Sequence, residues 1–186
     1  MEFNTAVYGP AVTRILALDQ NGNRLIPLVA NPTSCSESAR AALAGCTAAA
    51  LFPDASAPEA ALAGLWLYFS CFDECHAIAQ DLPTAVGSFW HAIVHRQEPD
   101  SGNSAYWFRR VGNHAVFPRL QEAAAEVKAR YPRADFQPGP AWDPFGFILF
   151  CEQALRQPGS ESMQAALEIQ RAEWQLLFDH CARPQS

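Results

Sequence analysis

His91 and His95 stand four residues apart. On an α-helix this spacing puts both imidazoles on one face, where they can present two ligands to one cation. The spacing is the geometric part of the HExxH motif of zinc proteases, but Ala92 stands where that motif has glutamate, so the likeness ends there. Glu98 would extend the same face by a further turn. We predict a metal site at this face. The alternative is that the two histidines bind no metal and are simply packed in the core or exposed to solvent.

A second group of ionisable residues follows a long apolar segment that ends near Cys71. Asp73 and His76 are three residues apart and share a helix face, which can orient the imidazole as a general base or a metal ligand. The alternative is that the helix simply emerges into solvent there. Two histidines and one carboxylate would leave coordination positions open for substrate. The candidate catalytic residues are His76, His91, His95 and Glu98, and the candidate metal ligands are His91, His95 and Asp73. The cation would be Zn, Fe, Mn or Ni.

A glycine-containing turn over residues 98–103 leads into a short helix with arginines near its end. The free backbone N–H groups of such a turn can receive an anion when arginines stand nearby. Tyr106 and Trp107 would form an aromatic wall of the pocket. The alternative is an ordinary helix capped by Asn103, with the aromatic residues in the core. The candidate ligand-binding residues are Arg96, Asn103, Tyr106, Trp107, Arg109, Arg110 and His114.

Helices must position these groups, because alanine-rich stretches and helix-start signals recur along the chain. We expect a mainly α fold, a single-domain multi-helix bundle over residues 1–186. Residues 10–20 are expected to begin a helix, but the Asn21-Gly22 pair before residues 25–29 leaves a short N-terminal β-hairpin open. The other expected helices cover about 36–51, 58–80, 84–97, 105–111, 118–131, 145–156 and 161–182.

Composition limits the classes of partner. The chain has 186 residues, of which 49% are hydrophobic and 17% charged, as in globular proteins. Its net charge of −6 and pI near 5.3 argue against nucleic acid or an anionic membrane. Residues 88–119 nevertheless carry four arginines against two acids, a net charge of +2, which is compatible with a small anionic ligand.

The compartment is expected to be the cytoplasm. The first ten residues lack the cationic start and apolar run of a secretion signal, and the apolar run over residues 60–72 is shorter than the roughly 20 residues of a membrane span. The six cysteines are therefore expected to be reduced, mostly as buried structural thiols. Glu173 is expected to be solvated.

Two functions follow from these residues. The first is an enzyme, or a degenerate enzyme, whose pocket lies between residues 73 and 114 and performs metal-assisted hydrolysis of an anionic substrate, or metal-free acid-base chemistry by histidine. The second is a non-catalytic helical module that binds a small anionic ligand or a partner protein. The sequence contains no glycine-rich phosphate loop, GxSxG elbow or dinucleotide fingerprint, which removes several enzyme classes. Homo-oligomerisation is left open.

Overall fold

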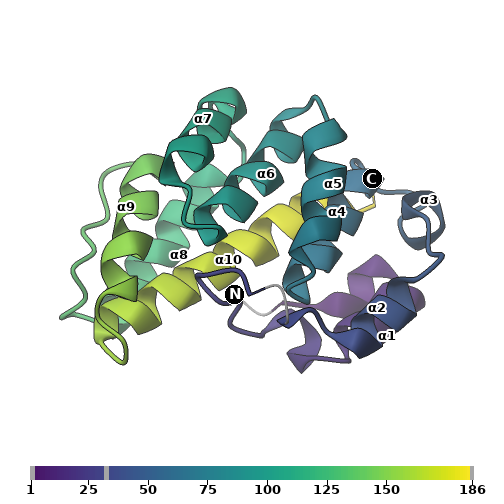
Figure 1. Cartoon of the computed structure of the whole chain (residues 1–186), viewed down its shortest axis with the longest axis horizontal. Coiled ribbons are helices and arrows are strands. Elements are labelled where there is room, and N and C mark those ends of the chain that lie inside the picture. Colours follow the sequence, from purple (N-terminus) through teal and green to yellow (C-terminus); the bar gives the residue numbers. More distant parts are fainter. Residues whose placement is uncertain (1–2, 32–33, 185–186) are drawn as a thin grey trace.

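A computed structural model describes residues 3–31 and 34–184 and is mainly helical, as expected. Figure 1 shows the arrangement of the helices. Their bounds are α1 Pro10–Leu16, α2 Glu37–Leu43, α3 Ala48–Leu51, α4 Pro58–Tyr68, α5 Phe72–Asp81, α6 Ala85–Gln97, α7 Ser101–Val111, α8 Phe117–Arg130, α9 Pro144–Leu155 and α10 Glu161–Ala182. Short 3₁₀ helices cover Thr5–Tyr8 and Gln20–Gly22. None of the helices in these two ranges is long and apolar enough to cross a bilayer.

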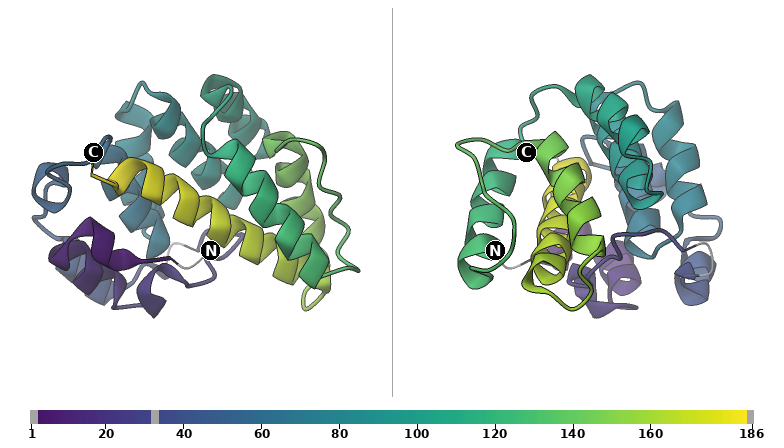
Figure 2. Two further views of the ribbon diagram at one scale, coloured as in Figure 1. Left: turned by 180° about the vertical axis from the view of Figure 1, so that it is seen from behind. Right: turned by 60° about the vertical axis from the view of Figure 1, so that its left-hand side comes forward.

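The long helix α10 runs through the middle of the molecule and packs against α4, α8 and α9. The helices α4 to α7 form a second group, in which α6 packs against α4, α5 and α7, and α7 also reaches α9 (Figure 2). Trp90 on α6 and Trp174 on α10 are almost fully buried in the core between these groups. The candidate residues of α5, α6 and α7 therefore lie on one packed unit.

The expected helix over residues 58–80 is broken into two. Ser70 adopts φ 61°, a left-handed conformation that ends α4, and the Cys71 N–H donates to the carbonyl of Trp66. The chain then restarts as α5, with Cys71 as its N-cap. This corner sets a new direction for α5, which packs on both α4 and α6.

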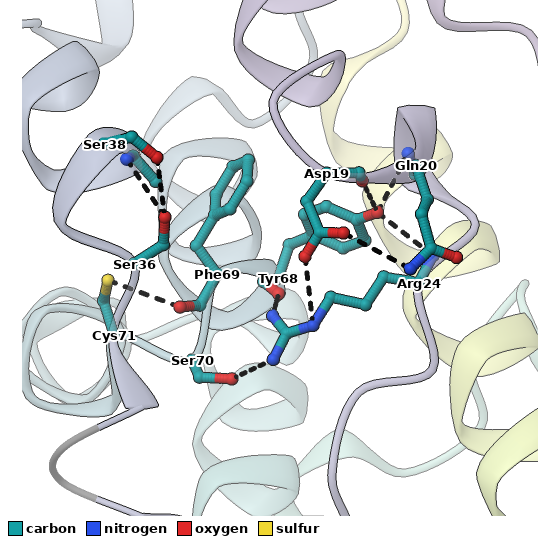
Figure 3. Close-up of polar contacts among 11 residues, drawn as sticks. Asp19, Gln20, Arg24, Ser36, Ser38, Tyr68, Phe69, Ser70 and Cys71 are labelled. Atoms are coloured by element: carbon teal, nitrogen blue, oxygen red, sulfur yellow. Dashed lines mark hydrogen bonds and ion pairs between the residues drawn. The ribbon is translucent and has the colours of Figure 1, made fainter.

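The N-terminal segment is tied to this corner by a polar network (Figure 3). The Tyr68 hydroxyl donates to the carbonyl of Asp19 and accepts the N–H groups of Gly22 and Arg24, each at 3.1 Å. The Arg24 guanidinium donates to the carbonyl of Tyr68 and to the Ser70 hydroxyl. A left-handed serine is strained, and these contacts help to hold it in place.

Of the two alternatives for the N-terminal segment, the expected helix forms at residues 10–16, with Pro10 at N1, and the β-hairpin is absent from the described residues, because residues 25–29 form no strand. Two other local expectations differ from the structure. The expected helix over residues 36–51 divides into α2 and α3 around Gly45, whose φ is +76°. The helix expected from residue 105 begins at Ser101 because Asp100, not Asn103, supplies the N-cap hydrogen bond.

The expectation that all cysteines are reduced was wrong for one pair. Cys35 and Cys71 form a disulfide between the segment before α2 and the start of α5. Cys75, Cys151 and Cys181 are buried free thiols, as expected, and Cys46 is half-buried and free. Cys35 and Cys71 are 36 residues apart, and their spacing in the sequence does not predict that they meet.

We expect reduction of this disulfide to lower the free energy of unfolding by about 3 to 4 kcal/mol, because the bond restricts a loop of this length in the unfolded chain. Urea unfolding with and without a reductant measures the difference. A Cys46→Ser variant serves as control and should show the same loss on reduction. Equal unfolding midpoints for the oxidised and reduced wild-type protein would contradict the prediction.

Candidate functional site

Three histidines from two helices converge on one point. His76 comes from α5, and His91 and His95 come from successive turns of α6. One ring nitrogen from each lies within 4.8 Å of the other two. The Nε2 atoms of His76 and His91 are 2.9 Å apart, and the rings of His91 and His95 are stacked with centroids 4.7 Å apart. This group is called the histidine cluster below.

The tautomer of His95 is set by its neighbours. Its Nδ1 lies 3.0 Å from a carboxylate oxygen of Glu98, so this nitrogen donates its proton and leaves Nε2 with a lone pair. The Asn103 amide donates to Nε2 at 3.1 Å. A carboxylate behind an imidazole is the usual arrangement behind a metal-bound histidine, since it orients the ring and raises its basicity.

Burial favours the neutral form of the two histidines on α6. His91 and His95 are 3% and 8% exposed. Burial, followed by the proximity of His76 and His95, lowers the pKa of His91 from 6.5 to about 4. Burial also lowers the pKa of His95, against the opposing effect of Glu98. Neutral imidazole is the form that binds a cation. The Nδ1 atom of His91 is buried without a hydrogen-bond partner.

The short helix α7 covers the cluster with an aromatic side chain. The Trp107 ring stacks on His91 with centroids 4.0 Å apart. The guanidinium of Arg110 lies 5.2 Å from the Trp107 ring and 6.0 Å from the ring of Tyr106, which is half exposed. This places a solvent-accessible cation beside the tryptophan that covers His91.

Several predicted residues lie outside this arrangement. Asp73 is exposed and does not join the three histidines, and Arg109 stacks on Phe145 of α9 instead. Asp73 does line a cavity of about 240 Å³, together with Glu74 and with Glu98, the partner of His95.

Arg96 is buried in the core, where it pairs with a carboxylate of the chain itself. Its guanidinium pairs with the carboxylate of Glu173 on α10, donates to Gln170 at 3.2 Å and lies over the Phe147 ring at 4.6 Å. Glu173 is fully buried, so the expectation that it is solvated was wrong. The guanidinium is therefore occupied inside the core, and Arg96 is no longer a candidate for binding an anionic ligand.

His114 belongs to a different part of the molecule. Its ring packs against Phe89 and against His180 of α10, and its Nδ1 accepts the N–H of Val116 at 3.3 Å. Burial, followed by the proximity of His180, lowers the pKa of His114 from 6.5 to about 4. Its role in the structure is that of a neutral, packed imidazole.

We expect His114 to make stability fall as the pH drops from about 6.5 towards about 4, by roughly 1 kcal/mol per pH unit. In this interval the unfolded chain binds a proton that the folded protein does not. Urea unfolding at several pH values, compared between the wild-type protein and His114→Gln, isolates the contribution. Parallel pH profiles for the two proteins would rule it out.

Two features had no usable signal in the sequence. The first is the Cys35–Cys71 disulfide with Glu74 beside it, and the second is the pairing of Arg96 with Glu173. Both join residues far apart in the chain, and neither follows a motif. His76, by contrast, has a local signal, because it lies one helical turn after Asp73.

In comparisons with protein-family models, with curated proteins and with solved structures, none was found that matches this chain.

Proposed function

We propose that the histidine cluster is a divalent-metal centre that activates water for hydrolysis of a small anionic substrate. The observation that carries this proposal is the convergence of one ring nitrogen each from His76, His91 and His95 within 4.8 Å. Zn²⁺ suits this donor set best, because imidazole nitrogens are among its preferred ligands and catalytic zinc sites use three protein ligands.

The separations are close to those of a loaded site. Two nitrogens bound tetrahedrally to one Zn²⁺ at about 2.0 to 2.1 Å are about 3.4 Å apart. The Nε2 atoms of His76 and His91 are 2.9 Å apart, so a small outward movement of the half-buried His76 ring makes room for the ion. The hydrogen bond from the Asn103 amide to Nε2 of His95 would break when the ion binds, while the contact between Glu98 and Nδ1 would remain.

A three-histidine centre leaves a fourth position for water. Zinc lowers the pKa of bound water to about 7 and so supplies hydroxide near neutral pH. Arg110, held beside Trp107, is the cation that would attract an anionic group of the substrate towards this water. The proposed reaction is therefore hydrolysis of an ester that carries a negative charge, either a phosphate ester or a carboxylate ester with a second, free carboxylate.

The proposal is tested by metal content and by a cobalt spectrum. Untagged protein purified without chelators is analysed by inductively coupled plasma mass spectrometry, and the metal-free oxidised protein is titrated with Co²⁺. We expect one equivalent of metal and the intense visible bands of four-coordinate cobalt, both lost in His91→Ala and in His95→Ala.

His180→Ala is the matched control, because His180 is an exposed histidine outside the cluster, and it should bind as the wild type does. Unchanged cobalt bands in His91→Ala would reject the centre. Hydrolysis is then assayed on nitrophenyl phosphate and on a nitrophenyl half-ester of a dicarboxylic acid, which both carry a negative charge, with Arg110→Ala expected to raise KM more than it lowers kcat. If the protein binds metal but hydrolyses neither class of ester, the hydrolase assignment is rejected and the metal centre is retained.

A second candidate, a non-catalytic anion-binding module, is favoured by a different feature. A cavity of about 550 Å³ is lined by Arg119, Arg183 and His180, with Asp179 among them. Asp179 already accepts from Arg183 at 2.8 Å and from the Tyr8 hydroxyl at 2.7 Å. The positive charge there is partly neutralised, which is why the histidine cluster is preferred. Binding of inorganic phosphate that is lost in Arg183→Ala, with no metal bound, would reverse this preference.

A further inference from the structure

A second set of metal-binding atoms lines the 240 Å³ cavity that Glu98 also lines. The Sγ atoms of Cys35 and Cys71 and a carboxylate oxygen of Glu74 lie within 4.8 Å of one another. All three residues line the cavity. Two sulfurs and one oxygen are a donor set that zinc accepts once the sulfurs are thiolates.

The arrangement of charge shows that these atoms already attract a cation. The guanidinium of Arg40 donates to Cys35 Sγ at 3.2 Å and pairs with one carboxylate oxygen of Glu74. The other oxygen, Oε2, is buried and has no hydrogen-bond partner. A buried carboxylate oxygen without a partner costs free energy, and a metal ion would satisfy it.

The two cysteines differ in how they are held. Cys71 is the N-cap of α5, is almost fully buried and directs its Sγ towards the carbonyl of Phe69 at 3.7 Å (Figure 3). Its thiolate would sit at the positive end of that ten-residue helix. Cys35 lies on the segment before α2 and is half-buried, which makes it the more exposed of the two residues and the expected point of attack by a reductant.

We propose that Cys35, Cys71 and Glu74 form a redox-gated site for a soft divalent cation, closed while the disulfide is present and open after its reduction. A cellular dithiol supplies the two electrons. One of its thiolates attacks Cys35 Sγ, breaks the Sγ–Sγ bond and releases Cys71 as a thiolate. The second thiol of the reductant then displaces Cys35 and leaves as a cyclic disulfide.

The cation then takes the place of the guanidinium. The two protein thiols give up their protons on binding the metal, and Arg40, whose side chain is 56% exposed, turns into solvent. Two cysteine sulfurs and Glu74 fill three positions, and the fourth faces the cavity. This site is independent of the histidine cluster and holds whether or not that cluster binds metal.

The test uses the whole wild-type protein in its oxidised and reduced forms. A phosphine reduces the disulfide, with water supplying the oxygen of the phosphine oxide and the two thiol protons, and is then removed by gel filtration. Each form is titrated with Co²⁺. We expect a thiolate-to-cobalt charge-transfer band in the near ultraviolet with the reduced protein only. Histidine ligands do not give this band, so it reports on the cysteines alone.

Variants separate this site from the other thiols. Cys46→Ser should keep the band, because Cys46 lies outside the three-donor group. Cys71→Ser should lose it. Glu74→Gln leaves both cysteines in place and should weaken Co²⁺ binding by at least about tenfold. No band with the reduced wild-type protein, an undiminished band in Cys71→Ser, or unchanged affinity in Glu74→Gln would each overturn the proposal.

Discussion

Zinc should raise the midpoint of thermal unfolding of the oxidised protein by roughly 5 to 10 °C when its free concentration is about a hundred times its Kd. The reason is linkage: His76 on α5 and His91 and His95 on α6 converge only in the folded chain, so the ion binds the native state and not the unfolded one. Differential scanning calorimetry over a zinc series measures the shift. The protein is kept oxidised so that the cysteines do not contribute.

The dependence on each ligand makes this result specific. His91→Ala and His95→Ala should each remove the zinc-induced shift, whatever they do to the metal-free midpoint. Glu98→Gln should reduce the affinity by about 10- to 100-fold, because its contact with Nδ1 orients the His95 ring. Zinc should raise the midpoint of thermal unfolding of His180→Ala by the same amount as that of the wild type. A zinc-induced shift of the same size in His91→Ala would show that zinc binds elsewhere.

Glu173→Ala should lower the free energy of unfolding by about 3 to 5 kcal/mol, because it leaves the Arg96 charge buried without its partner. Gln170 would remain as a single neutral acceptor for the guanidinium. Urea unfolding followed by circular dichroism measures the loss. The variant should keep its helical content at low denaturant.

A double variant shows where this cost comes from. Arg96→Met combined with Glu173→Leu should recover most of the stability, since two apolar side chains of similar volume leave no buried charge. Arg133→Ala is the exposed comparison, because the Arg133 side chain is 85% exposed in its pair with Glu161, and should leave the midpoint almost unchanged. A double variant no more stable than Glu173→Ala would mean that packing, not charge, sets the cost.

The helices with clear boundary signals were predicted closely from the sequence. The last helix was expected over residues 161–182 and forms there, with Ser160 as its cap, and α6 ends before Pro99 as expected. These outcomes follow from interactions between residues three or four apart, which the sequence displays directly. The same locality put His91 and His95 on one face.

Longer-range features could not be predicted in this way. A left-handed Ser70 turned one expected helix into α4 and α5, and nothing in the local sequence requires this conformation of a serine. The Cys35–Cys71 contact and the burial of Glu173 against Arg96 link residues 36 and 77 positions apart. Such pairs depend on how whole helices pack.

Residue types and their spacing were sufficient to predict a mainly helical chain and a pair of histidines on one helix face, because helix geometry makes residues four apart neighbours. The packing of the helices was needed to establish that His76 joins them, that Arg96 pairs with Glu173 and that Cys35 meets Cys71 beside Glu74. Contacts between elements are fixed by the burial of their apolar faces, so the partner of each polar side chain depends on which elements that packing brings together.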